Sequence, residues 1–166
     1  MYHRRNLINL SKVLNYVPTA VAFIKGNVDY SQINGTVKFF QTLKGVVVMA
    51  DVSGLPVSDE KCGNDIFAFH IHSGASCTGN AEDHFADAGT HYNPIDCPHP
   101  YHAGDMPPLF SANGTAVLAF LTDRFTVNEI IGKTVIMHDS SDDFTSQPSG
   151  NAGKKIACGE IVGVRR

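Results

Sequence analysis

The chain has 166 residues, enough for a single domain with a buried core, and it contains no tryptophan. Its formal net charge of −3 argues against nucleic acid as a partner, because nucleic-acid binding needs a basic surface. No run of about eighteen apolar residues occurs, so we expect a globular protein without a membrane-spanning segment.

The N-terminus begins with a basic cluster, and polar side chains interrupt the apolar stretch that follows it. A secretory signal needs an unbroken apolar core and a small-residue cleavage site. We therefore interpret residues 1–17 as a short amphipathic or disordered extension, followed by one domain over residues 18–166. The missing signal favours the cytoplasm, and the cell surface or the exterior is the alternative.

Strand patterns dominate the rest of the sequence. Short runs rich in Val, Ile, Phe and Thr are bounded by turn residues, whereas helical periodicity is weak. We predict an all-β fold, a Greek-key sandwich or barrel of about eight antiparallel strands. The clearest strands cover residues 20–26, 34–42, 45–54, 65–72, 113–121, 132–138 and 154–164.

Two long loops interrupt these strands, at about residues 73–112 and 139–153. Structureless segments of this length are usually functional or disordered. The first loop contains HYNPIDCPHPYHAGD, residues 91–105, which gathers three histidines and Asp105 in one short stretch. Most of the unusual residues of the chain lie in or beside these two loops, so we expect them to be functional.

Four histidines indicate a metal site. His70 and His72 are two residues apart on a predicted strand, and the period of two places both imidazoles on the same face. His138 ends another predicted strand, and His91 opens the long loop. Four imidazoles suit copper or zinc.

A second ion could bind His99, His102 and Asp105, with His91 shared between the two ions. Three histidines and one aspartate form the closed tetrahedral set that structural zinc prefers. A single histidine on a strand is more often an ordinary buried polar residue, but six of the eight histidines fall in this pattern. We expect surface positions for the other two, His3 and His84.

The cysteines leave several alternatives open. Four of them allow three complete pairings, and the sequence alone does not choose between these. The absence of a Cys-x-x-Cys motif argues against a zinc ribbon or a redox dithiol. An even number favours an oxidising environment, in conflict with the missing signal. The residues are Cys62, Cys77, Cys97 and Cys158.

From about residue 20 to residue 164 the chain resembles the copper–zinc superoxide dismutases, in the bacterial style. AVAFIKG resembles the first strand of this family, and FAFHIHSGASCTG resembles its copper-ligand strand with the following cysteine. THYNP and HPYHAGD resemble the bridging histidine and the end of the zinc loop. IIGKTVIMHDSSDD and GNAGKKIACGEIVG resemble the last copper ligand and the C-terminal signature. These segments occur in the order of the family.

The resemblance implies dismutation of superoxide to dioxygen and hydrogen peroxide at a copper–zinc site. His91 would bridge the two ions as an imidazolate. The implied copper ligands are His70, His72, His91 and His138. The implied zinc ligands are His91, His99, His102 and Asp105.

Further roles follow from the same resemblance. Asp142 would link a copper histidine to a zinc histidine, although the neighbouring Asp143 could have this role instead. Cys77 and Cys158 would form a disulfide that ties the long loop to the last strand. Closing such a loop could contribute roughly 4 kcal/mol in the chain-entropy model.

The sequence also departs from the family pattern. Lys155 stands where members usually carry a catalytic arginine, and Ser149 falls beside the substrate channel. Lysine keeps the positive charge but loses the planar guanidinium fork, so we expect a lower rate than an arginine variant would give. Cys62 and Cys97 are additional, and they could pair, stay as thiols or crosslink chains.

Two points stay open in this interpretation. The segment between His72 and Cys77 is short, so a dimer of the eukaryotic type is not assumed, and a monomer or another dimer is expected. The alternative function is a low-turnover structural or copper-buffering protein that binds copper and zinc. A zinc-only domain is a third hypothesis.

Overall fold

The structure, a computed structural model, describes residues 8–63 and 65–165. Its strands are β1 (Ala20–Gly26), β2 (Asn34–Thr42), β3 (Gly45–Ser53), β4 (Ile66–Phe67), β5 (Phe69–His72), β6 (Leu109–Phe110), β7 (Thr115–Thr122), β8 (Thr134–His138) and β9 (Lys155–Gly163). Its short helices are α1 (Leu10–Leu14), η1 (Val28–Tyr30), η2 (Ala86–Ala88) and α2 (Val127–Ile130). The prediction of an all-β fold is confirmed.

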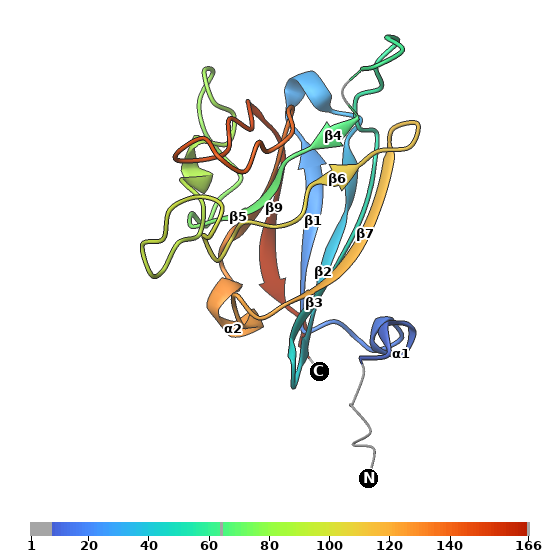
Figure 1. The fold of residues 1–166 in the computed structure, drawn as a ribbon, viewed down its shortest axis with the longest axis vertical. Coiled ribbons are helices and arrows are strands. Elements are labelled where there is room, and N and C mark those ends of the chain that lie inside the picture. Colours follow the sequence, from blue (N-terminus) through green and yellow to red (C-terminus); the bar gives the residue numbers. More distant parts are fainter. Residues whose placement is uncertain (1–7, 64, 166) are drawn as a thin grey trace.

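Seven strands form one curled sheet in the order β5-β8-β9-β1-β2-β3-β7, and every neighbouring pair is antiparallel (Figure 1). The late strand β9 returns to lie beside β1, which is the Greek-key arrangement. The short strands β4 and β6 pair with each other, and β6 also contacts β7. The sheet therefore curls around a core of alternating apolar side chains, among them Val37, Phe39 and Val48.

Strands β5 and β8 position the candidate site. Every residue of both strands is buried, because the core covers one face and the long loops cover the other. Along β5, Phe69 and Ile71 pack into the core, whereas His70 and His72 alternate with them and point the other way. The two long loops lie together beside β5 in Figure 1, and the side chain of Gln147 hydrogen-bonds the backbone of His99 across them.

The structure differs from the predicted elements in a few places. The strand predicted over residues 65–72 is divided into β4 and β5 at Ala68, whose N–H donates to the carbonyl of Ser140. The first long loop contains η2 and β6, which are too short to leave a periodic pattern. Helix α2 was also not predicted, although Thr126 and Glu129 form a capping box at its start.

The N-terminal extension is described only in part. Helix α1 lies within it and buries none of its residues, and residues 1–7 lie outside the described part of the chain. The boundary between residues 17 and 18 stays a prediction. No helix among the described residues combines the length and the apolar character needed to cross a membrane.

A disulfide joins Cys77, in the loop after β5, to Cys158 on β9. Cys158 is buried in a small apolar cluster with Phe85 and Ile136, beneath this loop. The pairing implied by the family resemblance is therefore present. Cys62 is exposed, Cys97 is half-buried, and both are free thiols.

Candidate metal centre

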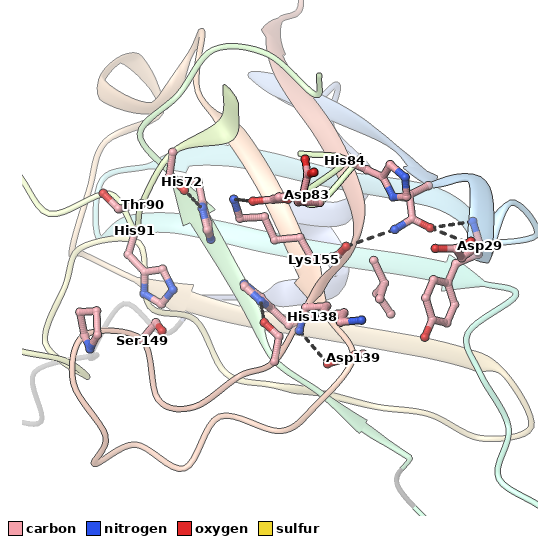
Figure 2. A pocket seen from close by; sticks show the side chains of 18 of the residues that line it. Asp29, His72, Asp83, His84, Thr90, His91, His138, Asp139, Ser149 and Lys155 are labelled. Atoms are coloured by element: carbon pink, nitrogen blue, oxygen red, sulfur yellow. Dashed lines mark hydrogen bonds and ion pairs between the residues drawn. The ribbon is translucent and has the colours of Figure 1, made fainter. Parts of the chain in front are cut away.

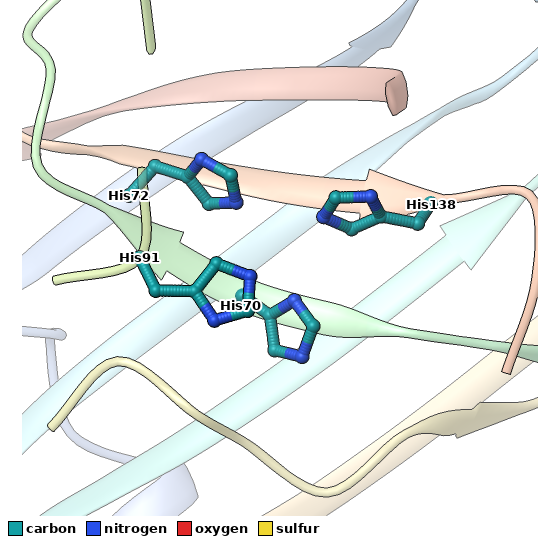
Figure 3. Close-up of side chains that lie close together, drawn as sticks. All are labelled: His70, His72, His91 and His138. Carbon is teal, nitrogen blue, oxygen red and sulfur yellow. The ribbon is translucent and has the colours of Figure 1, made fainter. Parts of the chain in front are cut away.

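Four histidines from three segments converge beside the sheet (Figure 3). His70 and His72 project from β5, and His138 is the last residue of β8. His91 forms an isolated antiparallel bridge with His72, which brings the long loop against β5. One nitrogen of each ring lies within 4.8 Å of the corresponding nitrogen of the others, and all four residues are buried. We call this set the four-histidine cluster.

One nitrogen of every ring in this cluster has no hydrogen-bond partner among the described residues. These atoms are His70 Nδ1, His72 Nε2, His91 Nε2 and His138 Nε2. A buried polar atom left unpaired costs about 1–3 kcal/mol, and such atoms are rare in folded proteins. Four of them gathered in one place fit a metal ion that accepts their lone pairs.

The opposite nitrogen of three of these rings is held by an oxygen outside the cluster. His72 Nδ1 donates to Gly89 O at 2.8 Å, His138 Nδ1 to Gly153 O at 3.2 Å, and His70 Nε2 to Asp142 Oδ2 at 2.8 Å. Because these oxygens only accept, the donating nitrogens carry the ring protons. The unprotonated nitrogens are thereby aimed into the cluster, as in known metal sites.

The charge state of the rings also suits metal binding. Burial lowers the pKa of His72 well below its usual value. Burial, followed by repulsion from His70, lowers the pKa of His138 to about 3. These imidazoles are therefore neutral at physiological pH, which is the form that binds metal ions.

A second cluster shares His91 with the first. We call it the mixed cluster: His91, His99, His102 and Asp105, all buried and with ligand atoms within 4.8 Å of one another. His91 Nδ1 lies 2.7 Å from Asp105 Oδ1, and His99 Nδ1 lies 3.0 Å from Asp105 Oδ2. His99 Nδ1 nevertheless makes no hydrogen bond within the described part of the chain. Three Nδ1 atoms and one carboxylate facing a common point fit a tetrahedral zinc ion.

The ring of His91 faces both clusters. Its Nδ1 lies in the mixed cluster, 3.4 Å from His102 Nδ1, and its Nε2 is one of the unpartnered nitrogens of the four-histidine cluster. A neutral imidazole has only one unprotonated nitrogen. The ring can coordinate through both nitrogens only by losing its last N–H proton, which two flanking cations make favourable.

Arg124 supports the loop that carries the mixed cluster. Its Nη1 donates to the carbonyl oxygens of Pro100, His102 and Asp105, at 3.1 to 3.3 Å. The carbonyl of His102 also accepts from the Asp105 N–H at 3.2 Å, within the turn that joins these two residues. The guanidinium therefore holds the backbone of the loop in the shape that directs His102 and Asp105 inward.

Asp142 connects the two clusters. Its Oδ2 accepts from His70 Nε2 at 2.8 Å, and its Oδ1 accepts from His99 Nε2 at 2.9 Å. Burial alone would raise the pKa of Asp142, but hydrogen bonds from His70, the Phe144 N–H and His99 lower it to about 2. Gly150 (φ +68°) makes room for this arrangement, since a Cβ there would collide with Asp142 and His99. The neighbouring carboxylate of Asp143 instead accepts hydrogen bonds within its own turn.

Replacing Asp142 with asparagine is expected to weaken zinc binding by about 10- to 100-fold, the usual effect of losing an outer partner of a ligating histidine. The amide would place a donor against a ring N–H. Zinc affinity can be measured by competition with a chelator of known affinity. Asp143→Asn makes the same charge change one residue away and is the matched control. Equal affinities of the two variants would contradict this role of Asp142.

The four-histidine cluster opens into a cavity of about 860 Å³, lined by three of its histidines (Figure 2). Lys155 lines the same cavity, as does Ser149, which was expected beside a substrate channel. His84, expected on the surface, is half-buried and also lines it, whereas His3 lies outside the described residues. Lys155 is not a free cation: its Nζ lies 2.8 Å from Asp83 Oδ2.

Several groups that support the candidate site were not predicted from the sequence. The carbonyl oxygens of Gly89 and Gly153, the guanidinium of Arg124 and the carboxylate of Asp83 each act on a residue far along the chain. Such roles depend on which segments meet in space. No local motif around these residues signals them.

Comparison with known proteins agrees with this geometry. Residues 33–161 match the family model described as copper/zinc superoxide dismutase. The chain is 31% identical over 145 residues to superoxide dismutase [Cu-Zn] 2 of Aquifex aeolicus, covering 78% of this chain and 80% of that protein. It is 33% identical over 135 residues to superoxide dismutase [Cu-Zn] of Legionella pneumophila, covering 76% of each. The solved structure of the Brucella abortus Cu/Zn superoxide dismutase has the same fold, with a TM-score of 0.69 at 21% identity over 85% of this chain and 98% of that one.

The curled sheet and the two clusters joined through His91 define an all-β protein built for two adjacent metal ions. Because the family model covers most of the chain, the protein belongs to the copper/zinc superoxide dismutase family. The resemblance stated from the sequence motifs is thus confirmed.

Proposed function

We propose that the protein is a copper–zinc superoxide dismutase, which converts superoxide to dioxygen and hydrogen peroxide. The observation that carries this proposal is the ring of His91, whose two nitrogens face two separate and complete ligand sets. Membership of the family supports the same activity. Both metals are accordingly expected as cofactors.

Copper fits the four-histidine cluster and zinc fits the mixed cluster. Four imidazole nitrogens suit copper, and three nitrogens with one carboxylate suit structural zinc. Bound copper supplies one-electron chemistry, by which one superoxide is oxidised to dioxygen and a second is reduced to peroxide. We assign copper to His70, His72, His91 and His138, and zinc to His91, His99, His102 and Asp105.

The side chains around the copper position have separate tasks. The Nε2 of His91 can take up and release a proton, because its Nδ1 is directed into the mixed cluster. The ammonium of Lys155 provides the positive charge that attracts an anion into the cavity. Ser149 also lines the cavity, with a small hydroxyl side chain. Asp142 orients His70 and His99 at the same time.

The alternative is a copper- and zinc-binding protein with little turnover, which would store or buffer copper. All four histidines of the four-histidine cluster are in place, and an open cavity lies beside them. The cavity favours the enzyme, since a buffering protein needs no access for a substrate beside the copper position. A zinc-only domain would not need the three further buried imidazoles of His70, His72 and His138, which lie outside the mixed cluster.

The decisive experiment is reconstitution with both metals followed by measurement of superoxide loss by stopped-flow or pulse radiolysis. We expect a rate far above that of buffer, and a rate near that of buffer in protein loaded with zinc alone. A fully loaded protein no faster than buffer would establish the buffering alternative. Metal analysis of protein made in copper-replete cells tests the zinc-only alternative, in which the protein would contain zinc but no copper.

The compartment and the oligomeric state are also proposals. The Cys77–Cys158 disulfide supports a location at the cell surface or outside the cell, because disulfides persist mainly in oxidising compartments. The short connection between His72 and Cys77 supports a monomer or a dimer unlike the eukaryotic one. Light scattering of the metal-loaded protein decides between these two states.

A further inference from the structure

The ammonium group of Lys155, which lines the cavity, is held in place by the carboxylate of Asp83. Lys155 is the first residue of β9 and the cross-strand neighbour of His138 on β8. Its Nζ donates to Asp83 Oδ2 at 2.8 Å and to Phe85 O at 3.1 Å, and Figure 2 shows the pair on the wall of the cavity. Two of the three ammonium protons are therefore engaged by the loop between Cys77 and His91.

This loop is built to hold a cation at that place. Asp83 Oδ1 accepts from the Phe85 N–H at 3.0 Å, and the side chain of Asn80 accepts from the Asp83 N–H at 2.9 Å. Phe85 is buried in the small apolar cluster that contains Cys158, three residues after Lys155. The disulfide fixes the start of the same loop to β9. The carboxylate therefore stands against Lys155 in a rigid turn.

The remaining charges of the cavity wall are mostly negative. Asp29, Glu82 and Asp139 line it, and Lys154 is the other lysine there. The side chain of Lys155 is only 15% exposed, whereas that of Asp83 is 39% exposed. A paired cation and anion act together as a dipole, whose field falls off faster with distance than the field of a single charge. Pairing with Asp83 thus weakens the attraction of Lys155 for an approaching anion.

We propose that Asp83 is a rate-attenuating residue, which neutralises Lys155 and reduces the affinity of the cavity for small anions, including superoxide. This inference rests on the proposed function, in which superoxide is the anion that enters the cavity. It also assigns a role to the loop between Cys77 and His91. The loop sets the effective charge beside the copper position.

The test compares Asp83→Asn with wild type, both loaded with copper and zinc. Asparagine keeps the size and an oxygen acceptor but removes the charge. At low ionic strength we expect azide affinity and the rate constant for superoxide loss each to rise about threefold, because a cleft with an unpaired charge focuses ions more strongly. The gain should vanish near about 0.5 M salt, where charges are screened within a few ångströms. Azide binding is followed by the visible absorption of copper.

Two further variants make the outcome specific. Glu82→Gln removes the same charge from the same wall but leaves the pair intact, and it should change azide affinity by less than half as much. In the double variant Asp83→Asn with Lys155→Met, the gain in azide affinity over wild type should disappear. A gain that persists without Lys155, or a fall in azide affinity on removing Asp83, would overturn the proposal. Equal metal content and equal melting temperatures confirm that all variants are folded.

The result is separable from the test of the proposed function. Inactivity of the fully loaded wild type would reject the dismutase proposal. The azide affinities of the four proteins would still decide whether Asp83 weakens the charge of Lys155.

Discussion

Replacing His138 with alanine is expected to lower copper affinity by more than about a hundredfold, since loss of an outer partner alone typically lowers metal affinity by about 10- to 100-fold. His138 Nε2 is one of the four nitrogens that meet in the four-histidine cluster. Without it the cluster has three ligands and a gap on the side of β8. The rate of superoxide loss should fall close to that of zinc-only protein.

The same substitution should leave zinc binding almost unchanged, because His138 does not belong to the mixed cluster. Metal analysis of the purified variant would then show zinc with little copper. His84→Ala is the matched control, since His84 lines the same cavity but lies outside both clusters. If the His138 variant bound copper and turned over superoxide as the His84 variant does, the assignment of the copper ligands would be wrong.

Removing the disulfide is expected to have the largest effect on stability. Cys77 and Cys158 are 81 residues apart in sequence, and closing a loop of this length stabilises the folded state by about 4 kcal/mol in the chain-entropy model. The double variant Cys77→Ala with Cys158→Ala leaves no unpaired thiol behind. We expect its free energy of unfolding, from urea titration of the metal-free protein, to fall by about 3–4 kcal/mol.

Cys62→Ser is the control for this experiment, because Cys62 is exposed and unpaired. Its free energy of unfolding should change by no more than about 0.5 kcal/mol, as is usual for surface substitutions. Loss of the disulfide should also weaken copper binding, since the same loop supplies the Gly89 carbonyl that holds His72. A loss of stability below about 1 kcal/mol would show that packing around Phe85 secures the loop without the disulfide.

Much of the fold could be predicted because its strands are long and their periodicity is local. Strands β1, β2 and β3 begin at the predicted residues, and β1 and β2 also end as predicted. Strands β4 and β6 have two residues each, and no periodic pattern can form over so short a length. Helix α2 is a single turn, and its capping box was the one signal that could have revealed it.

The residues of the candidate site could be predicted from strand geometry and from the order of the motifs. His70 and His72 share a face of β5 by the geometry of any strand. The order of the motifs around His91, His99, His102 and Asp105 suggested the rest through the family resemblance. The roles of these residues as metal ligands, and the effect of lysine rather than arginine at position 155, stay predictions that metal analysis and rate measurements decide.

The sequence by itself determined which side chains are candidate metal ligands, which of them share a strand, and which two cysteines match the family disulfide. Only the tertiary structure decided how these groups act on one another. The link from His70 through Asp142 to His99, and the pair between Lys155 and Asp83, each join residues far apart in the chain. Contacts of this kind arise because strand pairing and core packing bring distant segments together, and no local pattern encodes them.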